Sequence, residues 1–282
     1  MTATFDPSPW GTHLPGAFDR AVLALTRAMP ANWFGQRLAI LFRKLTMSRL
    51  GEGAIDTALW GMRLRLYPRR NGCEKNALFT PQMYDTMERR VLAQAVGRKR
   101  AGAFTFIDIG ANVGLYSLYL ASCGDVRTLA IEPQPGILER LNFHLAANPS
   151  AKVEVLPIAL SDRAGAATLV INDSDSGGTH LAKDGGRHDA GERVSVPSKP
   201  LIEVLSDAGI GRVDALKIDV EGAEDIVLEP FLRAAPQSLL PLLLLIEDTR
   251  GMWGVDLFAL LAARGYTVQE RSRQNVALRL GA

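Results

Sequence analysis

The sequence predicts a doubly wound α/β domain with a mostly parallel, seven-stranded sheet, a C-terminal antiparallel hairpin and an N-terminal helical extension. From residue 104 onward, short apolar runs alternate with segments of helical periodicity, which indicates parallel strands joined by crossover helices. Near the C-terminus, two short strands at 266–270 and 276–280 are separated by a polar turn. We expect this hairpin to add an antiparallel strand at one edge of the sheet.

The first 50 residues are predicted to form helices. Apolar residues recur at helical spacing on both sides of Pro30, and basic residues lie between those of the second stripe. Such helices are mostly caps docked on a main domain. The alternative is a helix with basic flanks that contacts a membrane surface or a protein partner. We therefore expect a helical extension over residues 1–56 and a larger domain over residues 57–282.

Two predicted elements lie between the helical extension and the sheet. Residues 57–67 alternate between apolar and other side chains, which predicts a strand pair or an edge strand. Thr80 followed by Pro81 predicts the start of a helix, because threonine caps helices and proline suits their first turn. Gly97 marks the expected end of that helix.

The elements of the sheet follow in chain order. Short, mostly apolar runs predict strands at residues 104–109, 128–131, 153–160, 215–220 and 242–246. The first run is interrupted by Thr105 and Asp108 and suits a strand buried on both faces. Helical periodicity predicts helices at residues 115–121, 137–145 and 257–263, with another between the fourth and fifth strands. A glycine-rich insertion at residues 172–192 separates the third and fourth strands, and a long loop inside a compact domain is typical of a lid.

Composition excludes several classes of protein. The chain has 282 residues, of which 47% are hydrophobic and 22% charged, so it is neither disordered nor fibrous. Its 2 cysteines cannot form a disulfide framework. The longest apolar run, residues 239–246, is too short to span a bilayer, and the first residues lack a secretory signal pattern. We therefore predict a soluble, cytoplasmic protein.

Charge is unevenly distributed along the chain. The net charge is +2, but residues 1–75 contain 11 Lys and Arg against 5 Asp and Glu. The remainder is therefore acidic, and it has no basic stripe with interleaved aromatic residues. This pattern argues against a nucleic-acid substrate.

The turn after the first buried strand is the first candidate for a binding site. It reads DIGANVG at residues 108–114, and its G-x-x-x-G spacing differs from the G-x-G-x-x-G that binds a dinucleotide pyrophosphate. The acid at Asp108 would repel a pyrophosphate and would suit an ammonium group. Glu132 follows at the end of the second strand, where a carboxylate can bind both hydroxyls of a ribose. These features predict an S-adenosylmethionine site, with a nicotinamide dehydrogenase as the alternative on the same sheet.

These residues belong to a series of segments that resembles the FkbM-type family of S-adenosylmethionine-dependent methyltransferases. The resemblance covers roughly residues 57–280. The matching segments are FIDIGANVGLYSL (106–118), IEPQPGILERLNFHLAAN (131–148), ALSDRAG (159–165), GGTHL (177–181), LKIDVEGAEDIVL (216–228) and LLLLIED (242–248). The resemblance implies a class I methyltransferase fold and O-methylation of a saccharide or secondary-metabolite hydroxyl.

The resemblance also implies which residues bind the cofactor. The implied residues are Asp108, Gly110, Asn112 and Gly114 at the methionine portion, Glu132 with Pro133 at the ribose, and Ile158 and Ala159 at the adenine.

A hydroxyl acceptor is a poor nucleophile until its proton leaves, so we expect a general base. The candidates are His180, Asp219 and Glu221. His180 lies in the glycine-rich insertion and has an imidazole suited to neutral pH, although a solvated loop histidine is the alternative. The two acids follow the fourth strand, where the alternative role is to cap the next helix.

Other roles are weighed against this assignment. Asp219 with Glu247 or Asp248 could hold a divalent cation, but we predict no metal site. Lys217 lies on the same face of its strand as Asp219, which makes a buried lysine–acid pair possible. N-methylation of a small molecule or peptide is an alternative reaction, and an inactive membrane-associated scaffold is the non-enzymatic alternative. The expected partner is a small-molecule or glycan acceptor.

Overall fold

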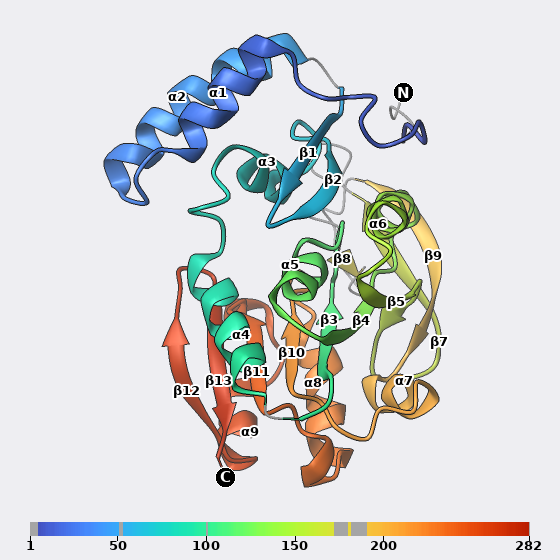
Figure 1. Cartoon of the computed structure of the whole chain (residues 1–282). Helices are drawn as coiled ribbons and strands as arrows, with labels where there is room; N and C mark the ends of the chain where they lie inside the picture. The colour runs from blue at the N-terminus through green and yellow to red at the C-terminus, as the bar shows by residue number, and fades with distance from the viewer. Residues whose placement is uncertain (1–4, 51–52, 100, 172–179, 182–190, 282) are drawn as a thin grey trace.

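The computed structural model describes residues 5–50, 53–99, 101–171, 180–181 and 191–281. Seven strands form the central sheet in the order β12–β13–β11–β10–β3–β4–β5 (Figure 1). This confirms the predicted doubly wound, mostly parallel fold. The strands are β3 (Phe104–Ile109), β4 (Val126–Ile131), β5 (Lys152–Leu156), β10 (Ala215–Ile218), β11 (Leu243–Glu247), β12 (Tyr266–Arg271) and β13 (Asn275–Leu280).

The C-terminal hairpin lies at one edge of the sheet. Strand β13 is antiparallel to both β11 and β12 and lies between them. The predicted antiparallel hairpin is confirmed, and its antiparallel strand β13 lies one position in from the edge, where β12 runs parallel to the rest of the sheet. The apolar residues of β13, such as Val276 and Leu278, explain the internal position because they are buried.

Helices cover both faces of this sheet. Successive side chains of a strand point to opposite faces, so Ile107 and Phe106 belong to different parts of the core. Ile107 packs with α7 (Leu201–Asp207), α8 (Glu224–Ala234) and α9 (Leu257–Ala263). Phe106 packs with α4 (Thr86–Arg98) and α5 (Leu115–Cys123), and α6 (Pro135–Ala147) lies against β4 through Leu141 and Ala130.

A second sheet was not predicted. Its strand order is β6–β9–β7–β8, with β6 (Ala159–Leu160), β7 (Gly165–Ile171), β8 (His180–Leu181) and β9 (Glu192–Lys199). The predicted third strand, 153–160, is divided between β5 and β6. Pro157 lies between them, and a proline cannot donate a hydrogen bond to a strand partner. Apart from His180–Leu181, Gly191 and Glu192, the glycine-rich insertion lies outside the described residues, so its predicted role as a lid stays a prediction.

The N-terminal region forms a cap on the sheet domain. It contains the predicted helices, α1 (Ala17–Arg27) and α2 (Trp33–Leu50), a hairpin of β1 (Ile55–Leu59) and β2 (Met62–Leu66), and the unpredicted α3 (Gly72–Phe79). Buried residues of the hairpin and α3 pack against Val113 and Leu115, which follow β3. The predicted boundary between residues 56 and 57 falls inside β1.

Helix α4 begins later than predicted. Residues 80–85 form turns, in which the amides of Met83 and Tyr84 both donate to the Thr80 carbonyl. Asp85 precedes the helix with a positive φ of 41°, and its carboxylate accepts a hydrogen bond from Tyr116 at 2.8 Å. The helix therefore begins at Thr86, and the prediction of a start at Thr80 was wrong.

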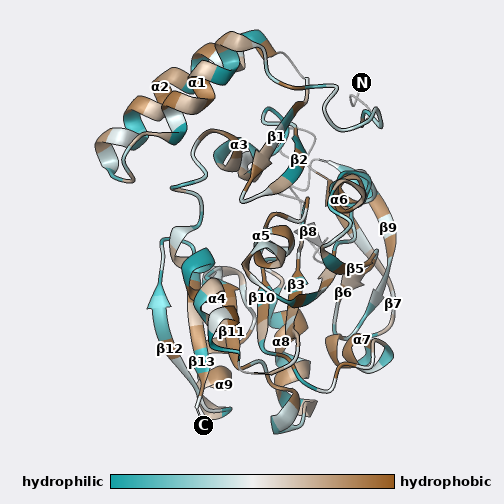
Figure 2. Ribbon diagram, viewed as in Figure 1, coloured by the Kyte–Doolittle hydropathy of each residue, from teal (hydrophilic) through white to brown (hydrophobic). Residues whose placement is uncertain are grey.

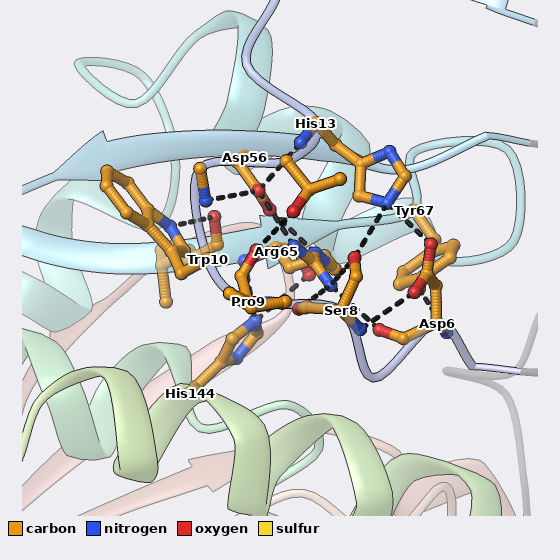
Figure 3. Close-up of polar contacts among 12 residues, drawn as sticks. Asp6, Ser8, Pro9, Trp10, His13, Asp56, Arg65, Tyr67 and His144 are labelled. Carbon is orange, nitrogen blue, oxygen red and sulfur yellow. Dashed lines mark hydrogen bonds and ion pairs between the residues drawn. The ribbon is translucent and has the colours of Figure 1, made fainter.

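A buried ion pair joins the first residues of the chain to the β1–β2 hairpin (Figure 3). Arg65 donates to both carboxylate oxygens of Asp56, at 2.7 and 2.8 Å, and both side chains are fully buried. The same guanidinium also donates to the carbonyls of Asp6, Ser8 and Pro9, at 2.8, 2.7 and 2.9 Å. The ion pair thereby fastens the first segment along the hairpin.

His144 connects this hairpin to the turn after β3. Its Nε2 accepts the backbone N–H of Arg65 at 2.9 Å, so Nδ1 carries the proton that is donated to the Val113 carbonyl at 2.8 Å. The ring is fully buried, and burial lowers the pKa of His144 to about 4. His144 is therefore a neutral structural residue.

We expect Gly110→Ala to lower the free energy of unfolding by about 2–4 kcal/mol. Gly110 has a φ of +71°, and an added Cβ would lie 1.9 Å from the carbonyl oxygen of Asp219. Gly209 is a matched control, because its φ is +63° but an added Cβ would meet no atom within 4 Å. Gly209→Ala should cost about 1 kcal/mol, from backbone strain alone. Urea denaturation of both variants measures the difference, and equal costs would contradict the proposed clash.

Candidate functional site

A cavity lies at the carboxyl ends of β3, β4 and β10. Its empty volume is about 940 Å³, part of which is open to solvent. Of the predicted site residues, the following line it: Gly110, Asn112, Glu132, Pro133, Ile158, Ala159, Asp219 and Glu221. Asp108 and Gly114 are not among the lining residues. The backbone of His180 pairs with Val170 in the second sheet, and its side chain lies outside the described residues.

The turn after β3 has left-handed backbone at Gly110, Asn112 and Gly114, with φ of 71°, 52° and 81°. Asn112 holds this conformation because its Oδ1 accepts the Val113 amide at 2.8 Å and the Asn71 side chain at 2.9 Å. Gly110 lines the cavity, and the backbone carbonyl of Asp219 occupies the space that a Cβ at this position would need.

Glu132 is held rigidly at the end of β4. Its Oε2 accepts the amide of Asn112 and its Oε1 accepts the amide of Gln134, both at 2.9 Å. The side chain is buried, and burial raises the pKa of Glu132 to about 7 although the two amide hydrogen bonds oppose the shift. Each carboxylate oxygen can accept a second hydrogen bond. The group can therefore bind a vicinal diol such as that of a ribose.

Asp108 lies behind the cavity wall. Its Oδ2 accepts the Ser117 hydroxyl at 2.6 Å, and its Oδ1 is buried with no partner among the described residues. Burial raises the pKa of Asp108, and the charge of nearby Lys217 opposes this effect. Asp108 itself does not line the cavity, whereas its neighbours Ile109 and Gly110 do. The predicted contact between Asp108 and the cofactor therefore stays a prediction.

A lysine and an acid form an ion pair at the end of β10. Lys217 Nζ lies 3.1 Å from Asp219 Oδ2 and 5.0 Å from the centre of the Tyr116 ring. Burial alone lowers the pKa of Lys217, but the carboxylates of Asp219 and Asp108 outweigh it and raise the pKa above its usual value. The predicted lysine–acid pair is present, and Asp219 remains partly exposed to the cavity.

Glu247 at the end of β11 hydrogen-bonds to Asp219. Burial, followed by the charges of Asp219 and Glu221, raises the pKa of Glu247 to about 8, so this carboxyl is mostly protonated at pH 7. Its Oε2 is buried with no partner among the described residues. Spacing in the sequence does not show this burial, so the sequence indicates Glu247 only as a candidate cation ligand.

The alternative role of Asp219 and Glu221 as caps of α8 is not observed, because the N-cap residue is Ala223 and no side chain caps this helix. Glu224 Oε1 accepts the amides of Val220 and Gly222, at 3.0 and 3.2 Å, at the beginning of α8. Glu221 has a φ of 55° and lines the cavity. Asp219 and Glu221 both line the cavity.

Metal ligation was the remaining alternative for these acids. Within the described part of the chain, no group of three or more His, Cys, Asp or Glu is arranged to hold a metal ion. Asp248 pairs instead with Arg250 and Arg271, the latter at 3.2 Å.

The N-terminal cap supplies one wall of the cavity, which the sequence analysis did not anticipate. Cys73 from α3 and Tyr84 from the turns before α4 line it. Cys73 is a free cysteine with an exposed side chain on this wall. No motif marks either residue, and α3 itself was not predicted.

Comparisons with known proteins point to one family. A family model described as the methyltransferase FkbM domain matches residues 108–268, which is more than half of the chain. Methyltransferase sdnD of Sordaria araneosa is 30% identical, over 56% of this chain and 80% of that protein. The AMB antimetabolite synthetase AmbE of Pseudomonas aeruginosa is 29% identical over 51% of this chain, which spans only 8% of that protein.

Solved structures are similar at low identity. Precorrin-6y C5,15-methyltransferase from Geobacter metallireducens GS-15 matches 72% of this chain and 89% of its own, with 13% identity and a TM-score of 0.41. A SAM-dependent methyltransferase from Agrobacterium tumefaciens matches 82% of this chain and 70% of its own, with 11% identity and a TM-score of 0.44. No helix among the described residues is long and apolar enough to cross a membrane.

Proposed function

Since this chain belongs to the FkbM methyltransferase domain family, we propose that it transfers a methyl group from S-adenosylmethionine to a hydroxyl of a small-molecule or glycan acceptor. The observation that carries the proposal is the buried Glu132 carboxylate, held by two backbone amides beside the cavity. A ribose diol supplies the two hydroxyl donors that this carboxylate can accept. The turn after β3 lacks the G-x-G-x-x-G spacing that binds the pyrophosphate of a dinucleotide, which argues against a nicotinamide cofactor.

The remaining cavity residues fit the other parts of this cofactor. Pro133, Ile158 and Ala159 provide an apolar wall for the adenine. The acidic side of the cavity, at Asp219 and Glu221, suits a cationic ligand. S-adenosylmethionine supplies a methyl group that is already activated by a positively charged sulfur, so the protein mainly aligns the acceptor with it.

Asp219 is our candidate for the base that removes the acceptor proton. It lines the cavity and hydrogen-bonds to Lys217, while the protonated Glu247 carboxyl hydrogen-bonds to it from the other side. These two partners fix its orientation, as a positioned base requires. Asp219 would hold the proton released by the acceptor hydroxyl, and S-adenosylmethionine would supply the methyl group. His180 and Glu221 stay the other candidates.

Calorimetric titration with S-adenosylhomocysteine, with NAD as the control ligand, tests the proposed cofactor. We expect saturable binding of S-adenosylhomocysteine and none of NAD. Binding of NAD alone would support the dehydrogenase alternative. Binding of neither ligand would overturn the assigned cofactor site.

We expect Glu132→Gln to weaken S-adenosylhomocysteine binding by about tenfold to a hundredfold at pH 8, because the charged acceptor of the ribose hydroxyls is lost. The pKa of Glu132 in the free protein is about 7. Affinity of the unsubstituted protein should therefore rise as the pH increases from 6 to 8, as the carboxyl ionises, and then level off. The Gln variant should not show this rise. An unchanged pH profile in the variant would contradict the role of Glu132.

A further inference from the structure

The surface of the α1–α2 hairpin is unusual because its large apolar side chains point outward. The exposed side chains are Leu14, Phe18 and Leu25 before and within α1, and Trp33, Phe34, Leu41 and Leu45 within α2, with exposed fractions of 40–69%. We call this set, together with the basic residues between its members, the hairpin surface. Figure 1 shows that the two helices lie at the periphery, away from the central sheet. Figure 2 shows hydrophobic ribbon along both helices.

Packing of the hairpin does not account for these side chains. The two helices contact each other, and the buried positions are Val22, Leu23 and Thr26 on α1 and Gly35, Ala39 and Thr46 on α2. On α2 the outward positions 34, 37, 41 and 45 recur at helical spacing, so they lie along one face. The apolar residues of that face are thus available to a partner outside the described chain.

The α1–α2 hairpin is strongly basic. Residues 14–50 contain six basic residues, Arg20, Arg27, Arg37, Arg43, Lys44 and Arg49, against one acid, Asp19. The Arg37 guanidinium lies 5.1 Å from the centre of the Trp33 ring, and that of Arg49 lies 4.7 Å from the centre of the Phe18 ring. Basic and apolar side chains therefore lie next to each other on the hairpin surface, so a single partner would contact both.

We propose that the hairpin surface binds the interface of an anionic lipid bilayer. Exposed Trp, Phe and Leu side chains interleaved with Arg and Lys suit the boundary between acyl chains and charged headgroups. A second copy of this chain is a poorer occupant, because two basic surfaces would repel each other across the contact. An anionic bilayer complements both the charge and the apolar side chains.

The hairpin is held firmly enough to orient the rest of the molecule. Arg27 donates to the Leu78 carbonyl at 3.0 Å and to Thr57 Oγ1 at 2.9 Å. Gln82 donates to the carbonyls of Thr26 and Met29, at 2.9 and 3.1 Å. These bonds attach α1 to the segment that carries Tyr84 in the cavity wall. A membrane-bound hairpin would therefore fix the orientation of the cavity relative to the bilayer.

Vesicle co-sedimentation of the full chain tests this proposal. The probes are vesicles of phosphatidylcholine alone and vesicles that also contain phosphatidylglycerol. We expect binding to the anionic vesicles to be at least about tenfold tighter and to weaken with added salt. The double variant Trp33→Ala, Phe34→Ala and the variant Arg37→Glu should each weaken it by about tenfold or more. Val268→Ala is the matched control, because Val268 is 46% exposed on the far edge strand β12.

The other outcomes are equally informative. Absence of binding to either vesicle, or binding that the hairpin variants leave unchanged, would overturn the proposal. Self-association that is lost in the Trp33→Ala, Phe34→Ala variant would show a second copy as the occupant. Binding of S-adenosylhomocysteine by each variant confirms that the domain is folded, and it separates this proposal from that of the cofactor site.

Discussion

Asp219→Asn is expected to lower the rate of methyl transfer by about 10²–10⁴-fold, the usual contribution of a general base. Affinity for S-adenosylhomocysteine should change far less, because Glu132 and the turn after β3 are untouched. The asparagine keeps the size of the side chain and can still accept a hydrogen bond from Lys217, but it cannot take the proton of a hydroxyl. Single-turnover rates and calorimetric titration of the same preparation measure the two quantities.

Glu247→Gln is the matched control for this variant. Glu247 has a pKa of about 8, so at pH 7 it is mostly neutral and can donate to Asp219 as a glutamine amide can. We expect its rate at pH 7 to stay within about a few fold of the unsubstituted protein. Equal losses in both variants would show that the pair acts through structure. A loss of cofactor affinity in Asp219→Asn would place this acid in the cofactor subsite.

Arg65→Ala is expected to lower the free energy of unfolding by about 3–5 kcal/mol, because it leaves the Asp56 carboxylate buried without its cation. The substitution also removes the donors to the carbonyls of Asp6, Ser8 and Pro9. Urea denaturation followed by circular dichroism measures the loss. Arg163→Ala is the control, because this arginine is 87% exposed and should change stability by no more than about 0.5 kcal/mol.

The double variant Asp56→Ala, Arg65→Ala separates the two causes of this loss. If the uncompensated charge dominates, the double variant should be more stable than Arg65→Ala alone. If the lost carbonyl contacts dominate, the two variants should be equally unstable. A loss below about 1 kcal/mol in Arg65→Ala would contradict a structural role for the ion pair.

The central sheet could be predicted because its strands are buried on both faces. Ile107 and Phe106 both enter the core from one strand, so the run is predominantly apolar and stands out in the sequence. The second sheet has a weaker signal. Strand β9 alternates exposed residues with buried Val196 and Ser198, and its partner β7 is separated from it by the glycine-rich insertion. Its pairing depends on tertiary contacts that no local pattern records.

The candidate site was predictable only in part, for a similar reason. Glu132 and Asp219 follow strands, and the carboxyl ends of parallel strands meet at one edge of the sheet. The protonation of Glu247 depends on burial and on the acids around it, which spacing does not show. The cap residues Cys73 and Tyr84 reach the cavity through turns and a short helix that carry no motif.

The contact between Gly110 and the Asp219 carbonyl also limits how this protein can evolve. The turn that contains Gly110 is proposed to bind the cofactor, and the loop that contains Asp219 is proposed to contact the acceptor. The backbones of the two segments pack directly against each other at this contact. A mutation that reshapes the loop would therefore disturb the cofactor side as well. The wall formed by Cys73 and Tyr84 belongs to the N-terminal cap and is separate from that contact. Substitutions there are the easier route by which the enzyme could acquire a different acceptor.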